Sequence, residues 1–551
     1  MRLLLGLWLG LLLVGCGGAG VRAGGGGGET GRCLLLTTND SEAHFDGERV
    51  SLEPLAYAGT IARIAATKKQ LLAERKGAVL LVSAGDVLQG RYMERRDGDR
   101  ARAAREAWQV YEAAGYDLGT LGNHEFDAGP KVLAHALRGL TRYRMVVSNL
   151  AKDSPTLDNR DGKLWDEVVV RDCGGVKLGF FGLLTPSTRT ISQFGDTRFV
   201  DPDDPVLPAA KRAIARLKAA GATVIVGLTH LGFEADVKLA ERLAGTGVDL
   251  LVGGHSHTLV KRWKAVSGIH VVQSGQRFSH LGHLEVVADG RGHFDPDASS
   301  WKVVPVGEPM PSDAPTEGSI AKLREGYDNE AVVGKRSVPW MLRGWGRRIY
   351  GRRVARAVWR YAAANNRFGL PVDGAILNSG GLRTSKVYPP GPVTNLEIRA
   401  IHPFGNRVVL VELDGEQLRD VLEHACTGGH RSALGERIEV WGLHFACDGE
   451  RPGVRYEMKD GKSVAIARRG QRVLGATVAG EPVRPDRRYH IAINDYLARG
   501  GSGYWAFSLG SRGCLDGTAF EPGHCKSSPT LATVVEGAVR DGSFDAPVPD
   551  R

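Results

Sequence analysis

The stretch Gly122-Asn123-His124-Glu125-Phe126-Asp127 places an amide, an imidazole and two carboxylates directly after a glycine. It is one of five polar clusters that stand where predicted strands end in the first half of the chain. The other four are Thr38–Glu42, Gly85-Asp86, Thr229-His230 and Gly253-Gly254-His255-Ser256-His257. Oxygen and imidazole donors suit Mn, Fe, Co or Zn, and the absence of thiols disfavours a soft-metal site. A lone histidine is usually structural, but five such clusters together predict a metal centre.

Short apolar segments that alternate with helical ones surround these clusters. Strands are expected at residues 34–38, 79–83, 145–148, 178–183, 224–228, 250–252 and 270–273, and helices at residues 56–75 and 102–114. This alternation predicts a layered α/β domain in which helices cover a sheet. Loops that follow the strand ends can then bring their polar side chains together.

The length of 551 residues exceeds what one hydrophobic core usually spans, so two domains are expected. The first is predicted over residues 33–306, a proline-containing and charged linker over 307–345, and a second α/β unit over 346–548. In the second unit, helices are expected at residues 354–364 and 416–424, and strands at 375–377, 408–413 and 489–493.

The overall composition is that of an ordinary globular protein, with 42% apolar and 24% charged residues. The formal net charge of +10 suits an anionic substrate or an acidic membrane surface. The arginines are scattered and form no basic cluster with interleaved aromatic residues. A nucleic acid polymer is therefore not an expected partner.

The N-terminus reads as an export signal. Arg2 precedes an apolar run from Leu3 to Val14, which is too short to span a bilayer but suits a signal-peptide core. The run ends in Leu13-Val14-Gly15-Cys16, a pattern that resembles the bacterial lipobox, whose cysteine carries the lipid. Residues 1–16 are thus predicted to be a signal with a lipid anchor at Cys16, and residues 17–32 a glycine-rich tether. The alternative is an ordinary signal peptide that is cut nearby.

Six cysteines remain after Cys16, and an even number in an exported protein favours disulfides. Six cysteines allow fifteen pairings. Closeness in sequence favours Cys426 with Cys447 and Cys514 with Cys525.

In order and spacing, the polar clusters resemble the metallophosphoesterases of the 5′-nucleotidase/UDP-sugar hydrolase family. GNHEFD and GGHSH are the most specific matches, and GDVLQG at residues 85–90 is a third. The resemblance continues with Asn378–Arg383 (NSGGLR), Pro403-Phe404 and Asn494–Tyr504 (NDYLARGGSGY), and so covers residues 34 to about 510. It implies a four-layer α/β/β/α calcineurin-like domain followed by a C-terminal substrate-binding α/β domain.

The resemblance also implies a role for particular residues. Two divalent metal ions would share Asp86 as a bridge. The first metal site would comprise Asp40, Glu42, Asp86 and His257, and the second metal site Asp86, Asn123, His230 and His255. His124 would act on the transferring phosphoryl group and Asp127 would orient it. Asn378 and Arg383 would contact the substrate, and Phe404 and Tyr504 would sandwich a base.

Three positions depart from the family pattern. The first motif is usually Asp-x-His, whereas this chain has Asp40-Ser41-Glu42. A carboxylate can still bind these metals, so Glu42 is the expected ligand, with His44 as the alternative. The stretch from Gly351 to Arg356 is unusually basic, and Ser502 stands where aspartate is common.

The resulting expectation is an exported, metal-dependent phosphoric ester hydrolase of nucleotide catabolism, periplasmic or at the cell surface. The favoured reaction is conversion of nucleoside 5′-monophosphates to nucleoside and phosphate. A 2′,3′-cyclic-nucleotide phosphodiesterase and a UDP-sugar hydrolase are alternatives on the same scaffold. A surface-anchored nucleotide-binding protein with a decayed metal site is the alternative outside enzymes.

Overall fold

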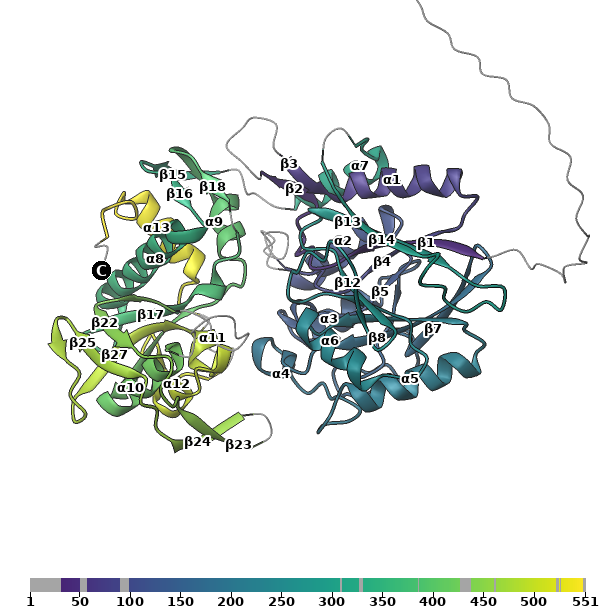
Figure 1. Ribbon diagram of the computed structural model, residues 1–551. Coiled ribbons are helices and arrows are strands. Elements are labelled where there is room, and N and C mark those ends of the chain that lie inside the picture. The colour runs from purple at the N-terminus through teal and green to yellow at the C-terminus, as the bar shows by residue number, and fades with distance from the viewer. Residues whose placement is uncertain are drawn as a thin grey trace, which may run out of the picture.

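The computed structural model describes residues 31–49, 57–89, 99–307, 310–326, 331–384, 386–426, 438–459, 462–521, 525 and 527–548. Figure 1 shows two lobes, of which the N-terminal one contains the purple-to-teal elements and the C-terminal one the green-to-yellow elements. The predicted leader, Cys16 and the tether up to residue 30 lie outside the described residues. Within the described residues, no helix has both the length and the apolar character that crossing a bilayer requires.

The N-terminal lobe contains two six-stranded sheets that pack face to face. The first has the order β14 (Ser300–Pro305), β13 (His280–Val287), β1 (Arg32–Thr38), β4 (Val79–Ser83), β5 (Leu118–Gly119) and β6 (Arg144–Met145). The second has the order β11 (Lys264–Val266), β12 (Ile269–Gln273), β10 (Leu250–Gly253), β9 (Val224–His230), β8 (Val176–Leu184) and β7 (Val168–Cys173). Strands β1, β4, β5 and β6 run parallel, as do β8, β9, β10 and β12.

Helices cover the outer faces of both sheets. The first sheet is covered by α1 (Ile61–Glu74), α2 (Arg100–Ala113), α3 (Pro130–Leu137) and α7 (Ala314–Glu325), and the second by α5 (Leu207–Ala219) and α6 (Phe233–Arg242). Alternation along β1 explains the layering: Leu34 and Leu36 pack under the helices, whereas Leu35 faces the second sheet. The predicted four-layer α/β/β/α architecture is confirmed.

The C-terminal lobe is built on one five-stranded sheet. Its order is β21 (Ile438–Trp441), β17 (Gly374–Asn378), β27 (Arg488–Asn494), β20 (Val408–Asp414) and β28 (Ser511–Cys514). One face packs on α8 (Gly344–Asn365) and α13 (Leu531–Arg540), and the other on α10 (Gly415–Ala425), α11 (Asp495–Ala498) and α12 (Ala506–Leu509). Along β20, Val408 and Leu410 face α8 and α13, whereas Val409 and Val411 face the opposite core.

Smaller elements complete both lobes. They are β2 (Asp46–Arg49), β3 (Tyr57–Thr60), the 3₁₀ turn η2 (His124–Phe126), α4 (Thr188–Ile191), β15 (Val332–Arg336), β16 (Trp340–Met341), η3 (Ser379–Gly381), β18 (Val387–Tyr388), β19 (Gly391–Thr394), α9 (Asn395–Ile401), β22 (Leu443–Cys447), β23 (Arg455–Lys459), β24 (Lys462–Arg468), β25 (Val473–Val478), β26 (Glu481–Pro482) and η4 (Gly501–Gly503). Within the predicted linker, α7 packs on the first lobe, whereas β15 pairs with β19 of the second.

Several predicted boundaries differ from the structure. The helix expected from residue 56 begins after Thr60, whose hydroxyl caps it by accepting a hydrogen bond from the Arg63 N–H. Residues 57–60 form β3 instead. The strand expected over 145–148 is reduced to β6, and α8 begins ten residues before the predicted start at 354.

Three disulfides cross-link the fold. Cys426–Cys447 and Cys514–Cys525 confirm the two pairs that closeness in sequence favoured. The third, Cys33–Cys173, joins β1 of the first sheet to β7 of the second inside the core between the sheets.

Candidate active site

The polar clusters meet at one edge of the paired sheets because the parallel strands that precede them end there. Asp40 follows β1, Asp86 follows β4 and Asn123 follows β5 in the first sheet. His230 is the last residue of β9, and His255 and His257 follow β10 in the second sheet. The site therefore forms between two sheets, with donors from both.

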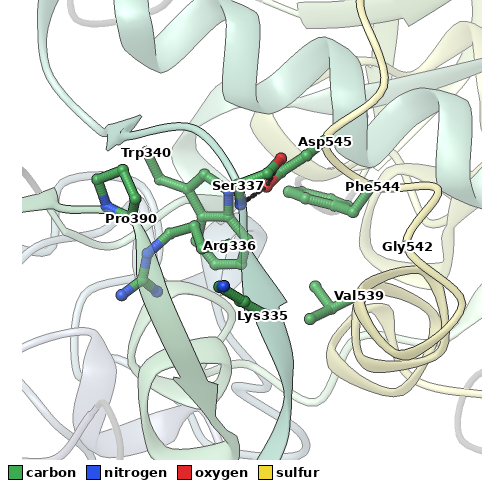
Figure 2. A pocket seen from close by; sticks show the side chains of 9 residues that line it. All are labelled: Lys335, Arg336, Ser337, Trp340, Pro390, Val539, Gly542, Phe544 and Asp545. Carbon is green, nitrogen blue, oxygen red and sulfur yellow. Dashed lines mark hydrogen bonds between the residues drawn. The ribbon is translucent and has the colours of Figure 1, made fainter.

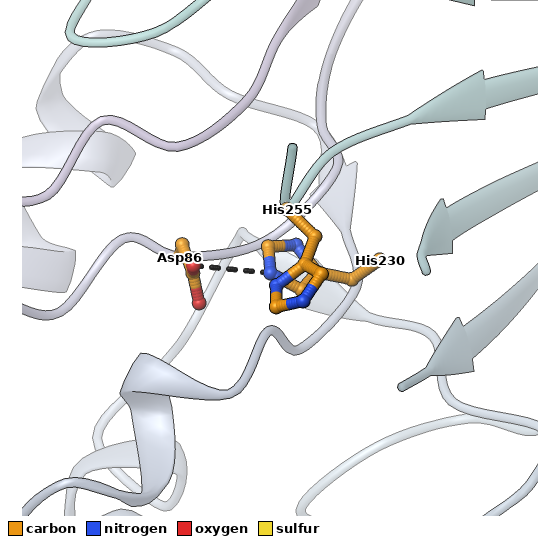
Figure 3. Close-up of side chains that lie close together, drawn as sticks. All are labelled: Asp86, His230 and His255. Carbon is orange, nitrogen blue, oxygen red and sulfur yellow. Dashed lines mark ion pairs between the residues drawn. The ribbon is translucent and has the colours of Figure 1, made fainter. Parts of the chain in front are cut away.

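Asp86, His230 and His255 form the tightest donor group (Figure 3). Their donor atoms all lie within 4.8 Å of one another, and Asp86 Oδ2 is 3.0 Å from His230 Nε2. One carboxylate oxygen and two imidazole nitrogens at this spacing suit a divalent ion such as Mn or Zn.

The neighbours of this group orient the donors for a metal. His230 Nδ1 lies 2.7 Å from the Ala84 carbonyl oxygen, which leaves Nε2 as the coordinating nitrogen. Asn123 Oδ1 is buried and has no hydrogen-bond partner among the described residues. Since a buried polar atom without a partner is costly, this carbonyl oxygen fits a metal ligand. The residues predicted for the second metal site therefore suit a divalent ion.

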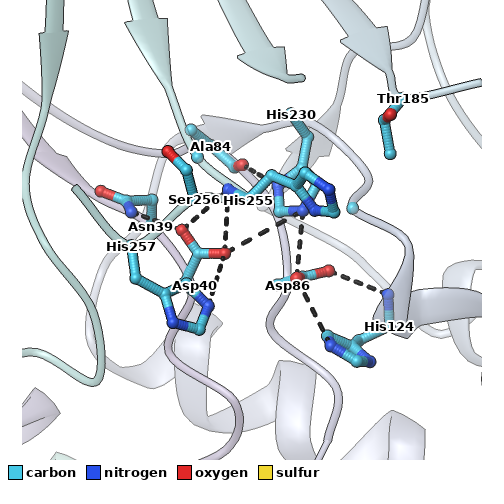
Figure 4. A network of polar contacts seen from close by, with 12 residues as sticks. Asn39, Asp40, Ala84, Asp86, His124, Thr185, His230, His255, Ser256 and His257 are labelled. Carbon is cyan, nitrogen blue, oxygen red and sulfur yellow. Dashed lines mark hydrogen bonds and ion pairs between the residues drawn. The ribbon is translucent and has the colours of Figure 1, made fainter. Parts of the chain in front are cut away.

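Asp40 and His257, which are predicted for the first metal site, lie beside this donor group (Figure 4). Asp40 Oδ1 is 3.4 Å from His257 Nε2 and 4.0 Å from His230 Nε2. The backbone N–H of His255 donates to both Asp40 carboxylate oxygens at 3.0 Å, and Asn39 Nδ2 donates to Oδ2 at 2.5 Å. The Asp40 carboxylate is thus fixed in place before any ligand binds.

The backbone of the donor residues lies in an uncommon conformation. Positive φ angles occur at Asp40 (49°), Glu42 (48°), Asp86 (54°), His255 (77°) and His257 (56°). Left-handed conformations are costly for residues other than glycine and persist where the surrounding structure enforces them. Their concentration here marks a functional site.

His124 and Asp127 are adjacent, as predicted. His124 Nδ1 is 2.7 Å from Asp127 Oδ2, and the His124 backbone N–H donates to Asp86 Oδ1 at 2.9 Å. Burial lowers the pKa of His124, but the Asp127 and Asp86 carboxylates outweigh it and raise that pKa to about 9. This raised pKa favours the protonated imidazole near neutral pH, and its Nε2 lies 2.9 Å from Gln89 Nε2.

Arg383 and Phe404 reach this histidine from the C-terminal lobe. Arg383 Nη2 is 3.4 Å from His124 Nε2, and the Arg383 guanidinium lies 5.7 Å from the centre of the Phe404 ring. The rings of Phe404 and His124 are 5.9 Å apart. A small cavity here is lined by Leu88, Gln89, Arg100, His124, Asp127, Ala128, Pro403 and Phe404. Residues from both lobes therefore enclose the same space.

Glu42 is completely buried and engages two arginines. Its Oε2 accepts from Arg277 Nε at 2.8 Å, and its Oε1 pairs with Arg383 Nη2. The same Oε1 is 3.7 Å from His257 Nε2, so the carboxylate lies beside another residue predicted for the first metal site. Burial raises the pKa of Glu42, but Arg383 and Arg277 outweigh it and hold that pKa well below its usual range. The alternative ligand His44 has its Nδ1 3.2 Å from the Ser41 carbonyl oxygen.

The two remaining predicted substrate residues are placed differently. Asn378 is buried at the end of β17, where its Oδ1 accepts from Asn494 Nδ2 at 2.8 Å. Tyr504 has 0% of its surface exposed and packs against the rings of His424 and Phe507. In this structure the Tyr504 ring belongs to the core of the lobe, and its stacking on a base stays a prediction.

The basic stretch that departs from the family pattern binds the C-terminal segment. Arg356 donates to the carbonyl oxygens of Ser543, Phe544, Ala546 and Pro547, at 2.8 to 3.0 Å. Arg353 Nη1 is 3.4 Å from Asp545 Oδ1. These arginines therefore stabilise the fold.

Beside this segment lies a cavity of about 450 Å³ (Figure 2). Its lining residues are Lys335, Arg336, Ser337, Trp340, Pro390, Val539, Gly542, Phe544 and Asp545, and none of the nine is a predicted site residue. Asp545 accepts from Trp340 Nε1 at 2.7 Å and Arg336 pairs with Glu397, so these groups serve the fold.

Sequence reasoning missed the residues that hold the site loops. Glu125 accepts hydrogen bonds from the backbone N–H groups of Asp86, Val87, Leu88 and Gly122. Gln273 donates to the Gly254 carbonyl oxygen at 2.7 Å and supports the loop after β10. Gln89 Oε1 accepts from Arg383 Nε at 3.1 Å, while its Nε2 is 2.8 Å from His124 Nδ1. Glu125 and Gln89 stand inside quoted motifs, but their partners are set by the fold.

Two family descriptions match successive parts of the chain. Residues 44–259 match the calcineurin-like phosphoesterases, and residues 350–509 match the 5′-nucleotidase C-terminal domain.

Individual proteins show the same similarity. Bovine 5′-nucleotidase is 28% identical over 85% of this chain and 83% of its own length. A trifunctional nucleotide phosphoesterase of Bacillus subtilis is 26% identical over 92% of this chain, which spans 35% of that longer protein. The crystal structure of a 5′-nucleotidase precursor from Thermus thermophilus superimposes with a TM-score of 0.74 at 26% identity, covering 93% of this chain and 97% of the other.

Proposed function

Because this chain belongs to the 5′-nucleotidase family of metallophosphoesterases and is a phosphoester hydrolase, we propose that it converts nucleoside 5′-monophosphates to nucleoside and phosphate. Two divalent metal ions would assist the reaction, held by the first and second metal sites. Bound metals of this kind activate a water molecule and stabilise the charge that develops on the phosphoryl group.

The donor residues divide between the two ions through Asp86. Asp40, Glu42 and His257 would complete the first metal site, and Asn123, His230 and His255 the second. The oriented Nε2 of His230 and the unpaired Oδ1 of Asn123 support the second site most directly. Nitrogen and oxygen donors allow Mn, Zn, Co or Fe.

His124 would place a positive charge and a proton beside the phosphoryl group. Asp127 holds the imidazole through Nδ1, which leaves Nε2–H to donate to a phosphoryl or leaving-group oxygen. The raised pKa keeps this proton in place at neutral pH.

Arg383 and Phe404 would recognise the substrate from the second lobe. A guanidinium suits phosphate oxygens because its N–H groups form a planar fork, and an aromatic face accepts any nucleobase. Asn378, at the start of the loop that carries Arg383, would keep that loop in position. Phe404 alone is the proposed stacking ring, since Tyr504 is buried.

The observation that carries this proposal is the approach of Arg383 Nη2 to His124 Nε2 at 3.4 Å. A phosphate-binding side chain of one lobe thereby faces the catalytic imidazole of the other. A phosphomonoester with a base could span this junction, with its phosphate at the metal sites and its base beside Phe404.

We further propose that the protein is exported and attached to the cell envelope through a lipid on Cys16. The three disulfides support an oxidising compartment, because cytosolic proteins seldom keep structural disulfides. Mass spectrometry of the mature N-terminus tests this. A diacylglyceryl group on Cys16 is the expected result, whereas a mature chain that begins beyond Cys16 would reject the anchor.

The decisive experiment is phosphate release from AMP, UMP, a 2′,3′-cyclic nucleotide and a UDP-sugar, with and without Mn²⁺. We expect metal-dependent turnover of AMP or UMP that is lost in His124→Ala. Preferred turnover of the cyclic nucleotide or the UDP-sugar would replace the proposed substrate with one of these alternatives. Nucleotide binding without turnover would instead identify a binding protein.

A further inference from the structure

We propose that Arg277 is a positioning residue that orients Glu42 in the first metal site and connects that site to the second lobe. The inference rests on the proposed function, in which Glu42 is a metal ligand. Arg277 lies in the loop between β12 and β13, 235 residues after Glu42 in the sequence. No motif quoted above contains it.

Two nitrogen atoms of the Arg277 guanidinium bind the same oxygen of Glu42. Its Nε and its Nη2 both lie 2.8 Å from Glu42 Oε2. The other oxygen, Oε1, faces His257 Nε2 at 3.7 Å and also pairs with Arg383 Nη2. By occupying Oε2, Arg277 determines which oxygen of Glu42 is presented to the first metal site.

Because Glu42 is buried, its carboxylate requires positive charge nearby, which Arg277 and Arg383 both supply. The Glu42 side chain is 0% exposed and that of Arg277 is 9% exposed. A histidine at position 42, as in the family pattern, would be neutral, whereas a buried carboxylate requires a compensating positive charge. Glu42 with its two arginines therefore takes the place of that single histidine, and Arg277 is the arginine that comes from the same lobe as Glu42.

The same guanidinium reaches the second lobe. Arg277 Nη2 donates to the Arg383 carbonyl oxygen at 2.5 Å, and the Arg277 backbone N–H donates to the Asp40 carbonyl oxygen at 2.8 Å. Arg277 thus contacts two residues of the first motif and the residue proposed to hold the substrate phosphate. Loss of Arg277 should disturb both metal binding and the position of Arg383.

A double-mutant cycle tests the inference by isothermal titration of the metal-stripped, full-length protein with Mn²⁺. The variants are Arg277→Met, Glu42→His and the combination of both, with the exposed Arg291→Met as the matched control. We expect Arg277→Met to weaken Mn²⁺ binding at one site by about tenfold or more, as the loss of a residue that orients a ligand does. In the Glu42→His background, the same substitution should change the affinity by less than about threefold, because the coupled partner is gone.

The result that would overturn the inference is an equal effect of Arg277→Met in both backgrounds, or unchanged or tighter Mn²⁺ binding in the single variant. Thermal unfolding in the presence of chelator shows whether each variant folds. If Arg277→Met does not fold, Arg277→Lys serves in its place. It keeps the charge but cannot reproduce the fork, so Mn²⁺ binding should weaken by less than in any neutral substitution while KM for AMP rises. An Arg277→Lys protein with unchanged KM and unchanged Mn²⁺ affinity would also reject the inference.

The wild-type protein separates this inference from the proposed function. Failure of the wild type to bind two Mn²⁺ ions or to hydrolyse any nucleotide would reject the proposed function. Normal metal binding and turnover in the wild type, with no change in Arg277→Met, would reject the role of Arg277 alone.

Discussion

Arg383 of the C-terminal lobe extends to within 3.4 Å of His124 in the N-terminal lobe, and its guanidinium also lies over the Phe404 ring. The groups proposed to bind the phosphate and the base therefore lie next to each other and next to the imidazole proposed to be catalytic. Because one group is proposed to bind the phosphate and the other the base, substrates with and without a base should separate their contributions to binding.

Replacing Arg383 should weaken phosphate binding whatever the rest of the substrate is. Arg383→Met is expected to raise KM by roughly 10- to 100-fold for both AMP and glycerol phosphate, because a charge-assisted contact to phosphate is lost. Arg383→Lys should recover only part of the loss, since an ammonium lacks the planar fork. Steady-state kinetics on the two substrates checks this, and an effect confined to AMP would contradict it.

Substitution of Phe404 should affect substrate binding, whereas substitution of Tyr504 should affect stability. Phe404→Ala is expected to raise KM for AMP without affecting glycerol phosphate, because only AMP offers a base to stack. Tyr504→Ala removes a fully buried ring and should cost about 3–5 kcal/mol of stability. Kinetics combined with denaturant unfolding distinguishes the two. A stable Tyr504→Ala protein with a base-specific defect would restore Tyr504 as a stacking residue.

The His124–Asp127 pair predicts a pH dependence. The raised pKa of about 9 means that the protonated imidazole is present below that pH and is lost as the pH rises through it. In Asp127→Asn, the main cause that raises this pKa is removed, so the value should fall toward the ordinary 6.5 or so. The alkaline limb of the kcat/KM profile should then move to lower pH. If the alkaline limb does not move in this variant, its pKa belongs to a group other than His124.

Chelation should abolish turnover, and substitution of single ligands should lower the number of metal ions that the protein binds. Dialysis against chelator is expected to abolish turnover, and added Mn²⁺ to restore it. Asn123→Ala removes a donor of the second metal site only, so the metal content should fall from about two ions per chain toward one. Elemental analysis measures this. Asp86→Ala should lose both ions, because this carboxylate is the proposed bridge, and retention of two ions in either variant would oppose the assignment.

The disulfides should differ in their contribution to stability. Cys33–Cys173 closes a loop with a sequence separation of 140, whereas Cys514–Cys525 closes one of 11. Chain entropy predicts that replacing the first pair by serines costs about 2 kcal/mol more than replacing the second. Urea unfolding of the two double variants measures the difference, and equal losses would contradict the entropic argument.

Sequence reasoning succeeded where a signal repeats along the chain. Short apolar segments such as the one that begins with Leu34, alternating with helical segments, gave the sheet positions, and the clusters ending in Asp86 and His230 gave donors that lie together. It failed where a partner is distant in sequence. Arg277 stands 235 residues from Glu42, and only the fold brings the two charges together.

Local sequence could not show how tightly some of these side chains are packed. Tyr504 stands in a recognisable motif, and only the structure shows that its ring packs in the core beside His424. The stretch from Gly351 to Arg356 stood out only as unusually basic, and the structure shows that Arg356 binds the carbonyl groups of the C-terminal segment. No nearby residue signals such a contact, because the acceptors are backbone groups almost 190 positions away.

The Cys33–Cys173 disulfide also has a mechanical consequence. Cys33 is the second residue of β1, which is hydrogen-bonded to β4 on one side and to β13 on the other. A pull on the chain ahead of β1 along the strand direction would have to shear both ladders at once. The covalent bond to β7 passes the same load to the second sheet, so the metal-binding edge at the far end of β1 is shielded from tension on the N-terminus.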